Sequence, residues 1–183
     1  MSVTTQQPLT GVFEADPNHS SFQFAVAHMK VSTFRATFGD VEARLIGDET
    51  GLRLEGTARA ESVSISDPPE FREHVVRSAE FFDADNHPQL TFRSTRVELA
   101  DDGAATVTGE LEIKGISRPV DATGTYRAPI EDPYGLQRTA LELRAVVDRR
   151  DWELNWQMPL PDGGDVLAWE VELTMNLELI QQS

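Results

Sequence analysis

The sequence predicts a mainly β fold: about eight antiparallel strands, closed into a barrel or packed as a sandwich, with one short helix. The first observation is a period-two alternation of apolar and polar residues, which recurs along the 183-residue chain and is typical of strands with one buried face. The second is regular punctuation by turn sequences such as Asp101-Asp102-Gly103. The third is that a helical pattern occurs in one segment. Strands with a single apolar face favour a closed barrel or a sandwich over an open sheet.

The strands follow from the alternation, taken in chain order. In a first strand over residues 20–28, the even-numbered residues from Phe22 to His28 share one face. The pattern is clearest near the C-terminus, where every second residue from Trp169 to Leu179 is apolar and the residues between are polar. Further strands are expected over 41–46, 52–60, 90–99, 105–113, 120–126 and 139–148.

The helix is expected over residues 68–79, after Asp67-Pro68-Pro69-Glu70. Asp67 is a suitable N-cap, proline is accepted in the first helical turn, and Glu70 has the spacing of a capping box. Phe71 and Val75, four positions apart, would form its apolar side.

Composition limits the partners. The chain has 31 acidic against 16 basic residues, a formal charge of −15, and no cysteine. A surface of this sign disfavours nucleic acid and anionic membranes, and the missing thiols remove disulfides and cysteine chemistry. The N-terminus has no signal-peptide pattern and no stretch is apolar enough to span a membrane. We therefore expect a flexible tail over 1–10, a single domain over 11–183, a cytoplasmic location and no membrane insertion.

The inward faces of the predicted strands combine very small residues with aromatic ones. The small residues are Gly56, Ala58, Ala60, Ala122, Gly124 and Ala145. In a small barrel they either pack against large residues of the opposite wall or leave a cavity. Aromatic residues on the same faces favour the cavity, although taper packing in a solid core remains an alternative.

Five sequence blocks, in order, resemble the signature blocks of the YceI-like, polyisoprenoid-binding family. They are EADPNHSSFQF from Glu14, RSAEFFD from Arg77, NHPQLTFRS from Asn86, GELEIKGISRPV from Gly109 and DRRDWELNW from Asp148. The resemblance extends from about Val12 to Ile180. It implies an extended antiparallel lipocalin-like β-barrel with a helix packed at one side, enclosing a tunnel for a long isoprenoid chain or a similar amphiphile.

The chain departs from the family pattern at several positions. Ala27-His28 stands where the family often has Arg-His, His74 is displaced by one position, and Glu153 replaces a usual glycine. Strand parity points Trp169 inward, where it would shorten or plug the tunnel. These departures favour a ligand shorter than a long polyprenyl chain.

Candidate site residues come from the predicted inward faces. The same parity points Arg149 and Asp151 inward, where each needs a partner, and a network of arginine and carboxylate at one barrel end would supply it. His28, Asp151 and Arg149 are the candidate catalytic residues if the protein is an enzyme. The four histidines lack metal-ligand spacing, so no metal site and no cofactor are expected. The candidate ligand-binding residues are Phe22, Phe24, Val26, His28, Phe34, Phe38, Phe92, Trp152, Trp156, Trp169 and Val171.

These residues predict a protein that binds, carries or sequesters an apolar or amphipathic small molecule, such as an isoprenoid, a quinone-like molecule or a fatty chain. The alternative is a cytoplasmic cyclase or isomerase of specialised metabolism that folds an apolar substrate in the same cavity. The sequence does not separate the two, although the absence of catalytic motifs favours binding. Edge strands and the exposed helix are surfaces through which a homodimer could form.

Overall fold

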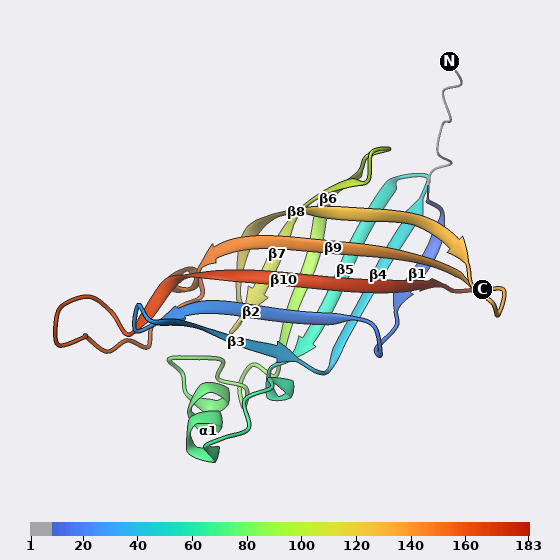
Figure 1. Ribbon diagram of the computed structural model, residues 1–183. Coiled ribbons are helices and arrows are strands. Elements are labelled where there is room, and N and C mark those ends of the chain that lie inside the picture. Colours follow the sequence, from blue (N-terminus) through green and yellow to red (C-terminus); the bar gives the residue numbers. More distant parts are fainter. Residues whose placement is uncertain (1–8) are drawn as a thin grey trace.

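A computed structural model describes residues 9–183, which form ten strands, one α-helix and two short 3₁₀ helices (Figure 1). The elements are β1 (Gly11–Ala15), β2 (Ser21–His28), β3 (Ser32–Phe38), β4 (Val41–Asp48), β5 (Gly51–Arg59), η1 (Ala60–Ser62), α1 (Pro69–Arg77), β6 (Gln89–Leu99), β7 (Ala104–Ile113), β8 (Ile116–Glu131), β9 (Gln137–Asp148), η2 (Arg149–Trp152) and β10 (Leu167–Gln181).

Eight of the strands close into an antiparallel barrel, as predicted. The order β1-β4-β5-β6-β7-β8-β9-β10 returns on itself because β10 also pairs with β1, with Phe13 opposite Gln181. Closure leaves no unpaired edge within this ring, so the inward faces are sheltered along the whole circumference.

The remaining strands, β2 and β3, form a hairpin that branches from the ring. The long strand β10 pairs with β1 near its C-terminal end and with β2 over most of its length, from Leu167 opposite His28 to Asn176 opposite Ser21. Strands β1 and β2 therefore follow one another along the same side of β10. Figure 1 shows the hairpin extending to one end of the barrel, with α1 beneath it.

The sequence prediction missed β1 and β3. Strand β1 has five residues, too few for a periodic pattern to stand out. Strand β3 alternates through Phe34, Ala36 and Phe38, but it has only seven residues, its other residues are polar, and a tight turn separates it from β2.

The interior consists of two hydrophobic clusters. One fills the closed part of the ring around Phe13, Leu45 and Leu141. The other lies between the ring, the hairpin and α1, around Phe38 and Trp152. The indole Nε1 of Trp152, which is fully buried, donates a hydrogen bond of 2.9 Å to the carbonyl oxygen of Leu111, so its one polar atom is satisfied.

Helix α1 starts later than the sequence suggested and without the expected cap. Pro68 occupies the N-cap position and makes no side-chain cap hydrogen bond, so the assignment of Asp67 as N-cap is wrong. The helix ends at Arg77, two residues before the expected end. Val75 is buried against the second cluster, whereas Phe71 is 38% exposed.

Arg77 fixes α1 to its surroundings. Its guanidinium donates to Glu61 at 2.8 Å, to Glu73 at 3.2 Å and to Asp85. Glu61 belongs to η1 and Asp85 to the segment before β6. This hydrogen-bonded cluster joins three consecutive pieces of the chain on the outer side of the helix.

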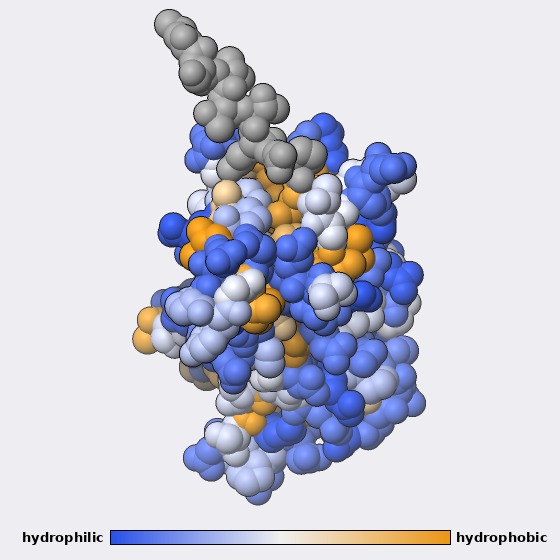
Figure 2. Space-filling view, turned by 90° about the vertical axis from the view of Figure 1, so that its right-hand side faces the viewer, coloured by the Kyte–Doolittle hydropathy of each residue, from blue (hydrophilic) through white to orange (hydrophobic). Residues whose placement is uncertain are grey.

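Residues 1–8 of the predicted tail lie outside the described part of the chain. Of the tail, Leu9 packs against the closed-ring cluster, and the carbonyl of Thr10 accepts a hydrogen bond of 3.2 Å from the Gln181 side chain. Hydrophilic residues cover most of the barrel face in Figure 2, in line with the net charge of −15. Within residues 9–183, none of the helices is long and apolar enough to cross a bilayer.

Candidate ligand-binding cavity

A cavity of about 420 Å³ lies between the β2–β3 hairpin, helix α1 and the ends of β9 and β10. It falls in the volume range of small-molecule sites. Its lining is mostly aliphatic and aromatic, from Phe22, Phe24, Val26, His28, Ser32, Thr33, Phe34, Phe38, Phe71, Val75, Phe81, Phe82, Leu90, Ile113, Val147, Arg149, Trp152, Leu154, Trp156, Leu167, Val171 and Leu173.

Strand β2 supplies one wall because its side chains alternate. The even-numbered residues from Phe22 to His28 line the cavity, while Ala27 on the opposite face is exposed. Strand β10 supplies the neighbouring wall with Val171 and Leu173, which pair with Val26 and Phe24.

Aromatic rings define the shape of the cavity. Phe22 stacks on Phe38 with ring centroids 5.5 Å apart and planes 15° apart. Phe38 also meets Phe82 edge to face at 5.6 Å, and Phe34 meets Phe71 in the same way at 5.9 Å. Such stacked and edge-to-face pairs contribute about 0.5–1.5 kcal/mol each beyond the apolar area that they bury, so they stabilise this wall.

Four polar side chains, those of His28, Ser32, Thr33 and Arg149, also line the cavity. His28 and Ser32 are paired across the hairpin, and His28 is also opposite Leu167 of β10. The guanidinium of Arg149 donates to the carbonyl of Leu167 at 3.2 Å. The polar groups therefore lie at the hairpin-tip end of the cavity, away from Phe22.

Arg149 is buried, with 4% of its surface exposed. Besides Leu167, its guanidinium donates to the carbonyls of Ala168 at 2.9 Å, of Trp156 at 2.9 Å and of Leu154. Burial lowers the pKa of Arg149 to about 10. The residue thereby ties the loop before β10 to the end of β9.

The expected network of arginine and carboxylate therefore takes a different form. Arg149 is held by main-chain carbonyls, and Asp148 pairs with Arg150 instead. Asp151 is exposed, so the prediction that it points inward is wrong. The reason is that β9 ends at Asp148 and the chain turns into η2, where strand parity no longer applies.

Trp169 also departs from its predicted orientation. It lines neither this cavity nor the smaller one described below. The register between β10 and β2 shifts between Leu167 and Val171, and this bulge changes which side Trp169 faces. Its indole Nε1 donates to Asp165 at 3.1 Å, and the guanidinium of Arg149 stacks on its ring.

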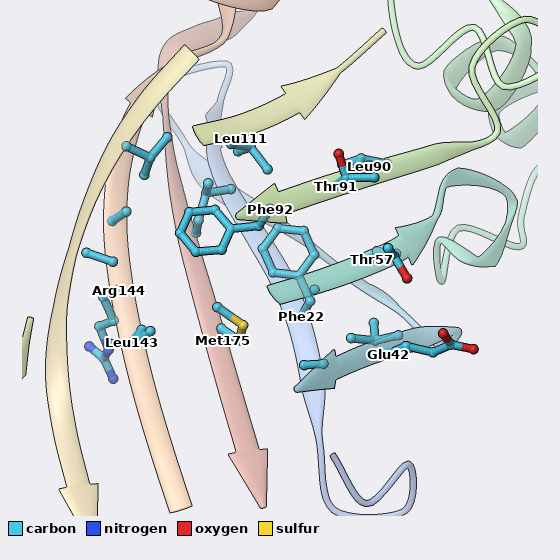
Figure 3. Close-up of a pocket in the computed structure, with 18 residues that line it drawn as sticks. Phe22, Glu42, Thr57, Leu90, Thr91, Phe92, Leu111, Leu143, Arg144 and Met175 are labelled. Carbon is cyan, nitrogen blue, oxygen red and sulfur yellow. The ribbon is translucent and has the colours of Figure 1, made fainter. Parts of the chain in front are cut away.

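A second, smaller cavity of about 80 Å³ lies further inside the ring (Figure 3). The rings of Phe22 and Phe92 project into this space, whereas Glu42 and Thr57 point away from it. Three residues line both cavities and so form the partition between them: Phe22, Leu90 and Leu173.

The small residues of the ring are mostly compensated by large ones. Gly56, Ala58, Ala122 and Ala145 line the smaller cavity together with Phe92, Leu111 and Leu143. A Cβ on Gly109 would lie 2.5 Å from the Phe92 ring, so glycine leaves room for this ring. Both sequence alternatives therefore hold in part: taper packing leaves a small void here, and the larger cavity forms under the hairpin.

The predicted binding residues are largely brought together. All of them except Phe92, which lines the smaller cavity, and Trp169 line the larger one. Phe81, Phe82 and Leu154 also line the larger cavity but were not among the predicted residues. The adjacent phenylalanines after α1 were a usable signal, because two large apolar residues next to a helix end rarely both face solvent.

A polar cluster on the outside of the barrel has the composition of a metal site. Oxygen and nitrogen atoms of Asp16, His19 and Glu178 lie within 4.8 Å of one another. However, Arg138 donates to Asp16 at 3.1 Å and to Glu178 at 2.8 Å, so a cation already occupies the centre. Hydrogen bonds from His19, from the Asn18 amide and from Arg138 lower the pKa of Asp16 to about 2. This cluster is an ion network that joins the end of β1 to β9 and β10.

Known proteins of similar sequence and structure agree with this architecture. UPF0312 protein SAS2572 of Staphylococcus aureus strain MSSA476 is 28% identical over 171 residues, which cover 91% of this chain and 95% of the relative. Among solved structures, Burkholderia cenocepacia BcnA superposes with a TM-score of 0.71 at 20% identity, covering 92% of this chain and 99% of that one.

A polyisoprenoid binding domain from Saccharophagus degradans superposes with a TM-score of 0.61 at 12% identity, covering 95% of this chain and all of the other. The family model of the YceI-like domain matches residues 13–179, from the third residue of β1 almost to the end of β10. The barrel, its branching hairpin and this match show that the chain belongs to the YceI-like domain family.

Proposed function

We propose that the protein binds an apolar or amphipathic small molecule in the 420 Å³ cavity and carries or sequesters it. The single observation that carries the proposal is this cavity, whose described lining is apolar except for four side chains at one end. An apolar pocket with a few polar groups at one end suits a molecule that has an apolar body and one polar end.

The comparison with Saccharophagus degradans supports an elongated apolar ligand, because that domain is described as polyisoprenoid binding. Each methylene group of a ligand that is buried in the cavity contributes about 0.8 kcal/mol to binding. Apolar contact is therefore enough for sequestration, which needs no catalytic group. His28 and Arg149 line the cavity but Asp151 does not, so the acid and base arrangement considered for an enzyme lacks its carboxylate.

The test places a larger side chain in one wall of the cavity, to take up the space that the ligand would occupy. Val26, which lines it, is replaced by tryptophan, and Ala27→Trp is the matched control because Ala27 is the exposed neighbour on the same strand. Binding of farnesol, a neutral isoprenoid alcohol, is followed through the fluorescence of Trp152 and Trp156, both of which line the cavity.

Wild type and Ala27→Trp should bind farnesol saturably with a 1:1 stoichiometry, and Val26→Trp should lose at least tenfold in affinity. Circular dichroism confirms that each variant is folded. If wild type binds neither farnesol nor a neutral or charged straight-chain amphiphile, the proposal is wrong.

A further inference from the structure

We propose that the ligand is a single-chain amphiphile with an anionic head group at Arg149 and a tail of about 15 carbons that ends at Phe22. This inference rests on the proposed binding function and specifies the chemistry of the same cavity. It follows from the charge of the lining, the bonding of Arg149 and the length between the two ends.

The charge of the lining is opposite to that of the protein. The chain has 31 acidic residues, yet none of the described residues that line the large cavity is Asp or Glu. The ionisable lining residues are His28 and Arg149, both at the hairpin-tip end. The cavity therefore has a positive end inside a strongly negative molecule.

Arg149 brings a charge into this apolar surrounding without a partner of opposite sign. Its four hydrogen bonds go to neutral carbonyl oxygens, and in the described part of the chain no carboxylate lies within ion-pair distance of it. The nearby carboxylates are engaged elsewhere: Asp148 with Arg150, and Asp165 with the Trp169 indole.

Arginine has five N–H donors, of which Arg149 uses four on the protein. A buried charge is costly unless it is paired, and hydrogen bonds to charged groups are about twice as strong as neutral ones. Asp148 and Asp165 act on Arg149 only from beyond ion-pair distance, so an anionic oxygen in the cavity would supply the direct ion pair that the described part of the chain does not. Carboxylate and phosphate ester heads share this chemistry.

The opposite end of the cavity limits the tail. Phe22 of β2 and Leu173 of β10 belong to the partition that separates the two cavities. On these neighbouring strands Phe22 lies opposite Met175, and Leu173 lies opposite Phe24. From His28 to Phe22 the wall spans six residue steps of β2, or about 20 Å at roughly 3.3 Å per residue. An extended chain advances about 1.3 Å per carbon–carbon bond, which gives a tail of about 15 bonds.

The volume leads independently to a similar length. A methylene group takes up about as much room as a water molecule in the liquid, about 30 Å³. The cavity of about 420 Å³ therefore holds about 14 such groups. Tails of 14 to 16 carbons fit, whereas a long polyprenyl chain exceeds both limits.

The experiment compares head groups on one tail, using wild-type protein and isothermal titration calorimetry at pH 7. The probes are tetradecanoate, tetradecyl phosphate, tetradecanol and tetradecyltrimethylammonium, each below its aggregation concentration. We expect the two anions to bind at least tenfold tighter than the alcohol, and the cation to bind weakest. The tighter of the two anions identifies the head group as carboxylate or phosphate ester.

Arg149→Met and Arg118→Met form a matched pair, because both remove one positive charge and Arg118 is exposed and lines neither cavity. Arg149→Met should abolish the preference for anions while still binding tetradecanol, and Arg118→Met should retain it. Equal losses in both variants would show a general effect of net charge and overturn the assignment. If Arg149→Met does not fold, the wild-type comparison of head groups still decides.

Tail length is tested with saturated carboxylates from 8 to 20 carbons. Affinity should rise about fourfold per added methylene and stop rising near 14 to 16 carbons. A rise that continues to 20 carbons would overturn the length. Equal binding of anion and alcohol would overturn the head-group assignment but leave the proposed function intact, whereas failure of every probe would refute the function itself.

Discussion

The guanidinium of Arg149 stacks on the indole ring of Trp169, with its Cζ atom 4.2 Å from the ring centroid. Arg149 lines the large cavity and Trp169 lies behind it. The indole therefore holds the arginine in place from outside the cavity, and such a contact is typically worth about 0.5–2 kcal/mol.

Replacement of Trp169 by leucine tests this arrangement. Because Trp169 does not line the cavity, the tail length at which affinity stops rising should stay the same. The affinity for tetradecanoate should fall about two- to tenfold, since Arg149 loses its stacking partner, while the affinity for tetradecanol should change little. A longer preferred tail in this variant would show that Trp169 is the plug that strand parity suggested.

The partition between the cavities can be opened from β10. Leu173→Ala removes a residue that lines both cavities, so the limiting tail should lengthen by about three carbons, the equivalent of the 80 Å³ of the inner cavity. Calorimetry with the series of carboxylates measures this change.

Leu177→Ala is the control, since Leu177 is an inward residue of the same strand that lines neither cavity. It should leave the tail limit unchanged and destabilise the protein by about 2–5 kcal/mol, because a fully packed leucine is lost. Leu173 already borders empty space, so its removal should destabilise less. An unchanged tail limit in Leu173→Ala would contradict its role in the partition.

Arg77 should control the movement of the helical wall. Arg77→Leu removes the contacts of α1 with Glu61 and Asp85, so amide hydrogen exchange over residues 69–77 should accelerate while the melting temperature changes little. Arg96→Leu, which removes an exposed pair with Glu98 on β6, is the control. Unchanged exchange in α1 would show that the helix is held by its apolar face alone.

The ion network at Asp16 predicts a loss of stability in acid. Its pKa is about 2 in the folded protein, below the usual 3.8, so the ionised form favours folding. This contribution is complete above pH 4 and disappears as the pH falls through 2. The pH dependence of chemical denaturation should therefore be flatter for Asp16→Asn between pH 4 and pH 2. Asp151→Asn, at an exposed position, should keep the wild-type slope.

Alternation was sufficient to predict antiparallel strands in a barrel or a sandwich, because most long strands have one buried face, and the resemblance to the family indicated the barrel. It also placed the β2 residues from Phe22 to His28 on the cavity wall, since period two survives along an uninterrupted strand. It failed at Asp151 and Trp169, which lie just beyond a strand end and within a bulge. Strand parity assumes that side chains alternate along an uninterrupted strand. It therefore assigns the wrong face at a bulge, or where the chain turns out of the strand.

Other features depend on contacts between distant segments, which a local pattern does not contain. The acceptors of Arg149 lie up to 19 residues away along the chain. The position of Phe82 against Phe24 and Phe38 depends on how the segment after α1 returns to the hairpin. The blocks that resemble the family indicated the overall shape but not these contacts.

On one side, β10 pairs with β1 near its C-terminal end and with β2 over the rest of its length. This arrangement divides the molecule into a scaffold, the closed ring, and an exchangeable part, the β2–β3 hairpin. Among the strands of the sheet, the hairpin pairs with β10 alone, and its β3 end also bonds to the segment after β5 through a bridge of Phe38 with Val63. The pairing within the ring of β1 and β4–β10 therefore does not involve β2 or β3. Under the binding function proposed above, changes in the hairpin can therefore alter ligand preference while the scaffold stays the same. Grafting the hairpin of one relative onto the ring of another should transfer ligand preference together with it.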